Sequence, residues 1–226
     1  MRRLVILLNV VLIALAGCSP RAKVTSSQTL KDSGKIEQAF ETINEATDPG
    51  NDNAEKTLNW PRTWEVRGEI FQAIYQSEDE KIKQLADEPL SEAYKSYKKA
   101  LELDDKGRFD NSLKVKLTLL TNDLTNQAVE AFNDNDYRKA LTSFEQILDI
   151  QSLDLIKADN PNAVDTVILY NAGLAAYNAQ LYDKAIDYYK EAAKYGYGEA
   201  KTYSLIANAY QMNKDTLGAV EVLKEG

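Results

Sequence analysis

The sequence contains no histidine and a single cysteine, Cys18. Histidine is the commonest side chain in general acid–base catalysis, and histidine and cysteine are the usual zinc ligands. The GxxxxGK[ST] and GxGxxG phosphate-binding loops are also missing, since Gly196 and Gly198 have neither a third glycine nor a preceding strand. Carboxylates such as Asp79 and Asp104 fall at predicted helix ends and loops. We therefore expect no enzymatic activity, no bound metal and no cofactor.

Basic residues are outnumbered by acidic ones. The chain has 27 Lys and Arg against 35 Asp and Glu, a formal net charge of -8. Without Arg2 and Arg3, which belong to the leader described next, 25 basic residues remain and the charge is about -10. Nucleic-acid binding rests on neutralising phosphates with Lys and Arg. We therefore expect no nucleic acid among the partners.

Long apolar runs are absent except at the N-terminus, where Leu4 to Ala16 follows Met1-Arg2-Arg3. This run of 13 residues is too short for a mature membrane span and has the form of a secretory signal peptide. Its end, Leu15-Ala16-Gly17-Cys18, resembles the bacterial lipobox. The resemblance implies cleavage after residue 17 and a lipid on Cys18, the residue that anchors the protein to a membrane.

The residues after the cysteine indicate where that anchor would lie. Residues 18–27 are predicted to be the lipidated cysteine and a polar tether. Ser19 resembles the enterobacterial pattern for transfer to the outer membrane, and no acidic run of the surface-export kind follows it. The predicted location is the outer membrane, facing the periplasm.

The rest of the chain carries a helical pattern that is clearest in residues 166–197. Its small residues, Gly173, Ala185 and Ala192, alternate with Tyr182 and Tyr189 at spacings that place one small side chain at each helix crossing. Residues 178–181 form the predicted turn. The stretch resembles one tetratricopeptide (TPR) repeat, a helix-turn-helix unit. The resemblance implies an all-α fold, a right-handed α-solenoid of TPR helical hairpins, over residues 28–226.

The same pattern recurs at other offsets and predicts about four repeats. Ala219 lies 34 residues after Ala185, and Ala140 lies 45 residues before it. Gly34 marks the turn of a degenerate first repeat. The repeat that begins near Asn59 carries about 13 extra residues, which we expect to form a lengthened first helix and a surface loop. Leucines spaced three or four residues apart predict one long helix over residues 110–134. The last repeat stops inside its second helix, so we expect that the sequence is incomplete or that a partner or another copy supplies the next helix. Asn160-Pro161 is predicted to start a helix after an insertion between residues 151 and 162.

The resemblance implies a partner-binding groove lined by the first helix of each repeat. The candidate groove residues are Tyr170, Asn171, Leu174, Tyr177, Asn178 and, one repeat later, Asn208. Asn side chains could hold a peptide backbone while Tyr and Leu contact its side chains. In the alternative interpretation, Asn171 is a common residue of the repeat, and Tyr170 and Tyr177 pack against the adjacent repeat. Only Lys201 is basic on this face, which argues against a clamp for a terminal carboxylate.

These features together predict a lipid-anchored scaffold or adaptor of the Gram-negative envelope that binds another envelope protein or a peptide segment. An alternative is a glycan- or peptidoglycan-binding lipoprotein, because 13 tyrosines offer stacking faces. That alternative requires several tyrosines to be exposed together.

Overall fold

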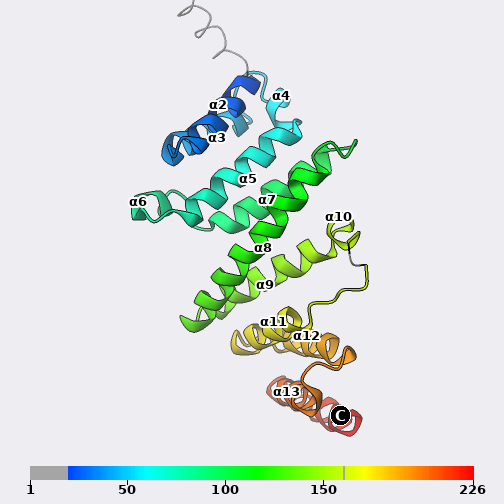
Figure 1. The fold of residues 1–226 in the computed structure, drawn as a ribbon. Coiled ribbons are helices and arrows are strands. Elements are labelled where there is room, and N and C mark those ends of the chain that lie inside the picture. The colour runs from blue at the N-terminus through cyan, green and yellow to red at the C-terminus, as the bar shows by residue number, and fades with distance from the viewer. Residues whose placement is uncertain (1–19, 160) are drawn as a thin grey trace, which may run out of the picture. The chain divides into compact units, whose positions relative to one another are not determined.

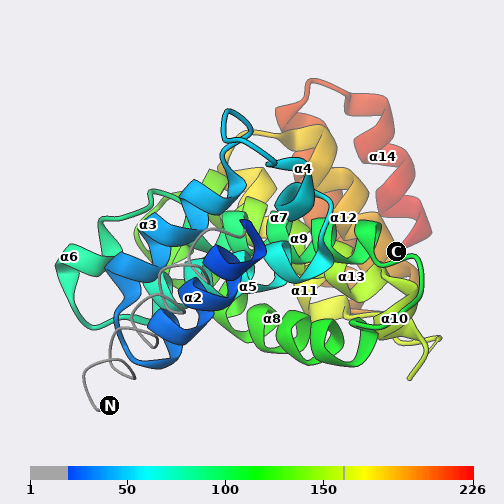
Figure 2. The ribbon, with the colours of Figure 1, turned by 90° about the horizontal axis from the view of Figure 1, so that it is seen from above.

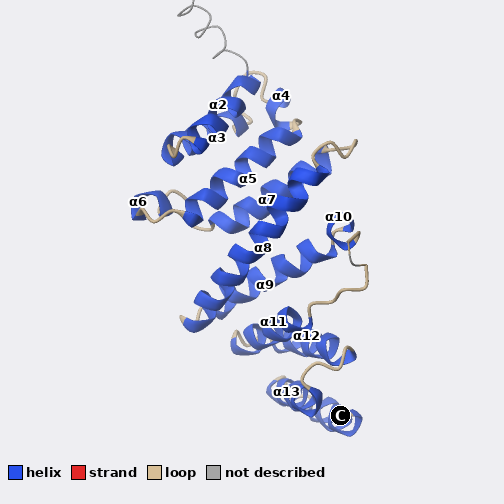
Figure 3. Cartoon of the chain, viewed as in Figure 1, coloured by secondary structure: helices blue, strands red, loops and turns tan. Residues whose placement is uncertain are grey.

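A computed structural model describes residues 20–159 and 161–226. Within these ranges the secondary structure is entirely helix, turn and loop, and Figure 3 draws no strand there. The predicted signal peptide and Cys18 lie outside the described residues. The chain divides into two compact units, of which unit 1 ends at Leu120 and unit 2 begins at Thr121. The prediction of an all-α chain is confirmed for the described part.

Unit 1 consists of helices that follow one another in antiparallel pairs (Figure 1). They are α2 (Pro20–Asp32), α3 (Ile36–Thr47), α4 (Glu55–Leu58), α5 (Pro61–Gln76), α6 (Glu80–Lys83), α7 (Pro89–Leu103) and the first part of α8 (Asp110–Asn133). Helices α2 and α3 pack against each other and against α5, and α5 packs against α7. The predicted extra segment between α5 and α7 holds the short helix α6.

Helix α2 corrects the predicted tether. It begins at Pro20, so residues 20–27 are helical, and Val24 and Ser27 are fully buried. The chain then turns at Gly34, whose φ of 76° is readily adopted only by a residue without a side chain. Ala39 and Ile43 of α3 are buried as the repeat pattern requires. The first repeat is therefore a complete hairpin, and the described residues hold five helical pairs where the sequence predicted about four.

Unit 2 contains the second part of α8 and the remaining helices, which again pack in chain order. They are α9 (Tyr137–Ser152), α10 (Asp154–Lys157), α11 (Thr166–Asn178), α12 (Tyr182–Lys194), α13 (Glu199–Met212) and α14 (Thr216–Glu225). Figure 2 shows α13 and α14 side by side. The long helix α8 was predicted from its buried leucines, among them Leu113 and Leu124, and its extent is confirmed to within one residue.

The hairpins α11–α12 and α5–α7 pack in the same way, with a glycine of the first helix against a tyrosine ring of the second. A Cβ atom on Gly173 of α11 would lie 2.6 Å from the Tyr189 ring of α12, and one on Gly68 of α5 would lie 2.4 Å from the Tyr97 ring of α7. Both distances are far shorter than van der Waals contact, so only glycine allows the helices to approach this closely. The predicted turn between α11 and α12 is confirmed, with Gln180 at a φ of 62°.

The start of α11 differs from the prediction. Asn160-Pro161 does not begin this helix, which starts at Thr166 with Asp165 as its N-cap. The Asp165 carboxylate accepts a hydrogen bond from the Ile168 backbone N–H at 3.1 Å. That bond satisfies one of the amide groups left free in the first helical turn. The insertion is therefore longer than the Asn-Pro signal indicated.

No helix in the described ranges is long and apolar enough to cross a membrane.

Candidate partner-binding groove

The first helices of the three hairpins in unit 2, α8, α11 and α13, each present one row of side chains that are exposed or half-buried. We call these residues the groove face. They are Asn122, Thr125, Asn126, Val129, Phe132 and Asn133 on α8; Val167, Tyr170, Asn171, Leu174, Tyr177 and Asn178 on α11; and Lys201, Ser204, Leu205, Asn208, Gln211 and Met212 on α13. Lys201 is the one charged residue of this set, although 27% of the whole chain is charged.

A small pocket of about 130 Å³ lies within the groove face. Three helices line it, with Val129, Phe132 and Asn133 from α8, Phe144 from α9, and Asn171 and Leu174 from α11. We call it the groove pocket. Phe144 is 3% exposed, whereas Val129 is 51% exposed. The pocket therefore has a fixed aromatic wall and an accessible aliphatic rim.

Two amide side chains stand among these apolar walls. Asn133 is exposed and Asn171 is half-buried, and no hydrogen bond joins either side-chain amide to another described residue. Each amide offers two N–H donors and one carbonyl acceptor. An apolar pocket with adjacent free amides can hold an aliphatic side chain while the amides bond to the backbone on either side of it.

The structure brings together two of the six residues that the sequence singled out for the groove, Asn171 and Leu174. Tyr170 instead packs on Tyr189 and Tyr197, with ring centroids 5.7 and 5.1 Å apart. Tyr177 packs edge-on against Tyr182 at 5.6 Å. The two tyrosines are therefore part of the packing, as in the alternative interpretation, but these ring contacts lie within their own repeat, residues 166–197, and not with the adjacent repeat.

The two remaining asparagines lie apart from the groove pocket. Asn178 is exposed, and its side-chain amide donates to the Leu174 carbonyl oxygen of its own helix at 2.8 Å. Asn208 is exposed on α13. Sequence reasoning missed Phe144, which lies 45 residues before Tyr189 at a core position of the repeat, and missed Asn126, which lies 45 residues before Asn171.

Tyr189 has an unusual environment behind the groove face. Its side chain is fully buried, and its hydroxyl oxygen has no hydrogen-bond partner among the described residues. Burial raises the pKa of the Tyr189 hydroxyl well above its usual range, and the nearby hydroxyl groups of Tyr170 and Tyr177 add to the effect. The group therefore stays neutral, and it contributes packing without a compensating bond.

In unit 1 the corresponding face of α5 is closed by charged side chains. Glu65 and Glu69 occupy the places of Tyr170 and Leu174 relative to the glycine of the helix. Glu69 forms ion pairs with Lys31 of α2 at 2.8 Å and with Lys116 of α8 at 2.9 Å. Fully buried Glu65 is paired with Arg62 and accepts a hydrogen bond from the Ser112 hydroxyl at 2.6 Å. The face of α5 therefore differs from the open groove face of unit 2, on which Lys201 is the one charged residue.

These pairings shift two pKa values in unit 1. Burial alone would raise the pKa of Glu69, but the hydrogen bonds from Lys31 and Lys116 outweigh it, so the pKa is lowered. Burial alone would lower the pKa of Lys31, but its bonds to Asp32 and Glu69 outweigh it, so that pKa is raised. Both shifts favour the charged forms of the two groups. The ion pairs of Glu69 with Lys31 and Lys116 hold α2 and α8 against α5.

The described residues contain no group of three or more Asp, Glu, Cys or His side chains that could hold a metal ion. The lipidation candidate Cys18 lies outside these residues.

No protein-family model matches the sequence. No curated protein matches it either. Among solved structures, one MamA crystal structure is 16% identical over 91% of this chain and 88% of that chain, with a TM-score of 0.35. MamA from Desulfovibrio magneticus RS-1 is 17% identical over 91% of this chain and 92% of that chain, with a TM-score of 0.35. PilW, a widely conserved type IV pilus biogenesis factor, is 14% identical over 91% of this chain and 75% of that chain, with a TM-score of 0.35.

Proposed function

We propose that this protein is a lipid-anchored scaffold of the bacterial envelope that holds a segment of another protein in the groove face of unit 2, without catalysis of its own. The observation that carries the proposal is the groove pocket, where apolar walls and two free amides meet on a face with a single charge. The lipobox-like end of the leader supports the envelope location and the anchor at Cys18.

The chemistry of the groove face indicates what the segment would look like. A face whose one charged residue is Lys201 offers little to compensate the desolvation of a charged side chain, so charged residues are disfavoured at its centre. Leu174 and Val129 would contact one aliphatic or aromatic side chain. Asn133 and Asn171 would bond to the peptide groups beside it, which requires an extended backbone whose N–H and C=O groups are free.

Site-specific photo-crosslinking tests this proposal. A photo-reactive amino acid at Val129, on the accessible rim of the groove pocket, should give a discrete adduct with one protein in the cells that make this chain. The matched control is the same probe at Tyr195, which is 54% exposed and lies outside the groove face, against 51% for Val129. Adducts of equal pattern from both positions, or none from Val129 in a folded protein, would contradict the proposal.

Glycan binding has less support. Stacking on sugars requires several aromatic faces to be exposed together. Among the described residues, which include all 13 tyrosines, only Tyr195 is exposed, and the other tyrosines are half-buried or buried. Tyr170, Tyr177, Tyr182 and Tyr189 pack against one another or against a neighbouring tyrosine. We therefore favour a protein partner.

A further inference from the structure

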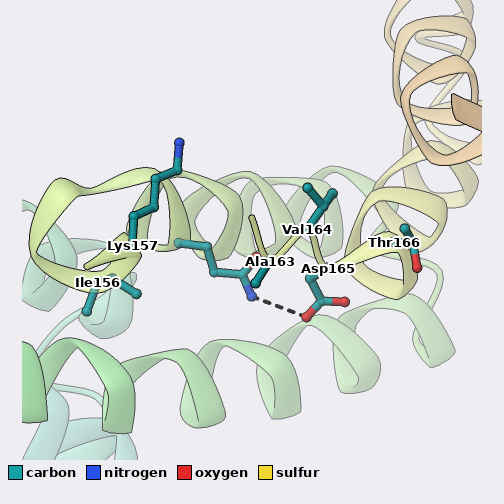
Figure 4. Close-up of a pocket in the computed structure, with 7 residues that line it drawn as sticks. Ile156, Lys157, Ala163, Val164, Asp165 and Thr166 are labelled. Atoms are coloured by element: carbon teal, nitrogen blue, oxygen red, sulfur yellow. Dashed lines mark hydrogen bonds between the residues drawn. The ribbon is translucent and has the colours of Figure 1, made fainter. Parts of the chain in front are cut away.

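A second cavity of about 430 Å³ in unit 2 lies open to solvent between α9, α10 and the start of α11 (Figure 4). It is lined by Gln151 at the end of α9, Ile156 and Lys157 of α10, Ala163 and Val164 of the following loop, and Asp165 and Thr166 at the start of α11. We call it the insertion cavity. Its volume falls in the range of small-molecule sites, about 300 to 1,000 Å³.

Hydrogen bonds fix two polar groups of this cavity. The Asp165 carboxylate accepts one bond from the Ile168 backbone N–H at 3.1 Å and another from the Gln151 side-chain N–H at 3.2 Å. The second bond is drawn in Figure 4. It orients the Gln151 amide, so that its carbonyl oxygen is left without a donor among the described residues. The cavity therefore contains one positioned, free acceptor.

Lys157 supplies a free cation to the same cavity. It is exposed, and no carboxylate of the described residues lies within ion-pair distance of its ammonium group. Lys184 of the same unit, in contrast, is paired with Glu145 at 2.6 Å. In Figure 4 Ile156 and Lys157 lie at one side of the view, and Val164, Asp165 and Thr166 lie at the other.

The remaining walls are apolar. Ile156, Ala163 and Val164 contribute aliphatic groups, and Val164 is 38% exposed although it lies at a cavity. A ligand that contacts these side chains would remove apolar surface from water, which is favourable. Binding there combines a cation, an acceptor and an aliphatic wall.

We propose that the insertion cavity binds the α-carboxyl group of an aliphatic amino-acid residue together with the N–H group of that residue. The carboxylate pairs with the Lys157 ammonium group, the N–H donates to the Gln151 carbonyl oxygen, and the aliphatic side chain contacts Ile156 and Val164. Both the last residue of a peptide and a free N-acylated amino acid carry this chemistry. The site is separate from the groove pocket and does not depend on the groove having a partner.

Calorimetric titration of the full-length protein in detergent micelles tests the chemistry. The probes are N-acetyl-leucine, N-acetyl-leucinamide and N-acetyl-Ala-Ala-Leu with a free carboxylate. A charge-assisted bond is worth enough that the acid should bind about tenfold more tightly than the amide. Lys157→Gln should reduce the affinity for the acid to that for the amide. Lys224→Gln removes the same charge from an exposed position of α14 outside the cavity and should leave the affinity unchanged.

A second variant locates the site. Val164→Asp places a negative charge on a partly exposed wall position and should abolish binding of the two probes that carry a free carboxylate. The thermal unfolding midpoint of each variant shows whether it is still folded. Binding of the tripeptide alone supports the proposal with a peptide C-terminus as the source, and equal binding of N-acetyl-leucine supports it with a free amino-acid derivative. Equal affinities for acid and amide, no binding of any probe, or binding unchanged by both variants overturns it.

Discussion

At the scale of single residues, two repeats use the same glycine and tyrosine pair but differ at the tyrosine hydroxyl. Tyr97 donates its hydroxyl hydrogen to the Gln72 side-chain oxygen at 3.0 Å. The place of Gln72 relative to the helix glycine is taken in α11 by Tyr177, and the Tyr189 hydroxyl is left without a bond. The same substitution should therefore have different effects in the two repeats.

Tyr97→Phe should lower the free energy of unfolding by about 1 kcal/mol, because it removes a buried hydrogen bond. Tyr189→Phe should change it by less than about 0.5 kcal/mol or increase it, because the lost hydroxyl is buried without compensation. Urea unfolding of both variants, followed by far-UV circular dichroism, measures the difference. Equal losses in the two variants would show that the Tyr189 hydroxyl does have a bonding partner.

Gly173→Ala should be destabilising. In an exposed helix interior this change normally increases stability by about 0.5 to 1 kcal/mol. Here the new Cβ atom would lie 2.6 Å from the Tyr189 ring, so overpacking should reverse the sign and cost about 1 to 3 kcal/mol. Gly173→Leu should cost more. Thermal unfolding of the Ala variant gives the sign directly, and a raised midpoint would mean that α11 and α12 do not cross at this residue.

At the scale of elements, the ion pairs of Glu69 join α2 and α8 to α5. Because its pKa is lowered in the folded protein, Glu69 contributes stability above the unfolded value of 4.5, and the contribution is lost as the pH falls through the folded pKa. Glu69→Gln should destabilise the protein at pH 7. The difference between wild type and variant should shrink as the pH falls below 4.5.

Urea unfolding at several pH values between 7 and 3 measures this difference. Glu102→Gln is the control, since its pair with Lys99 is exposed, at 59% and 45% of the two side chains, and such pairs contribute little. A Glu69→Gln effect that stays constant with pH would mean that the lost interaction is packing and not charge.

The elements also show which parts of the fold are readable from sequence. Helix α8 was predicted because its leucines repeat every three or four residues, and burial of that stripe determines the helix. Helix α2 was missed because it buries only two side chains, Val24 and Ser27, so no apolar period marks it. The start of α11 was misplaced because Asp165 is held by both Ile168 and Gln151, and the second contact comes from another helix.

The two candidate binding sites could also be predicted from the sequence only in part. Asn171 and Leu174 could be assigned to the groove from their places in the repeat. The groove pocket itself could not, because Phe144 reaches it from α9, the second helix of its hairpin. The insertion cavity has no sequence signature, since it depends on the path of the loop that carries Ala163 and Val164.

At the scale of the whole molecule, the proposed function requires that the protein be held at a membrane by Cys18. The chain carries a net charge of about -10 without its leader, so electrostatic attraction to an anionic lipid surface cannot replace the anchor.

Cys18→Ser removes the thiol that would carry the lipid and should move the protein from the membrane fraction to the soluble fraction after a high-salt wash. Ser19→Ala keeps the cysteine and should leave the protein in the membrane fraction. Acyl chains contribute roughly 0.8 kcal/mol per buried methylene, so the anchored protein should resist the salt wash that removes charge-bound proteins. Retention of the Cys18→Ser variant in salt-washed membranes would exclude a lipid at this position as the anchor.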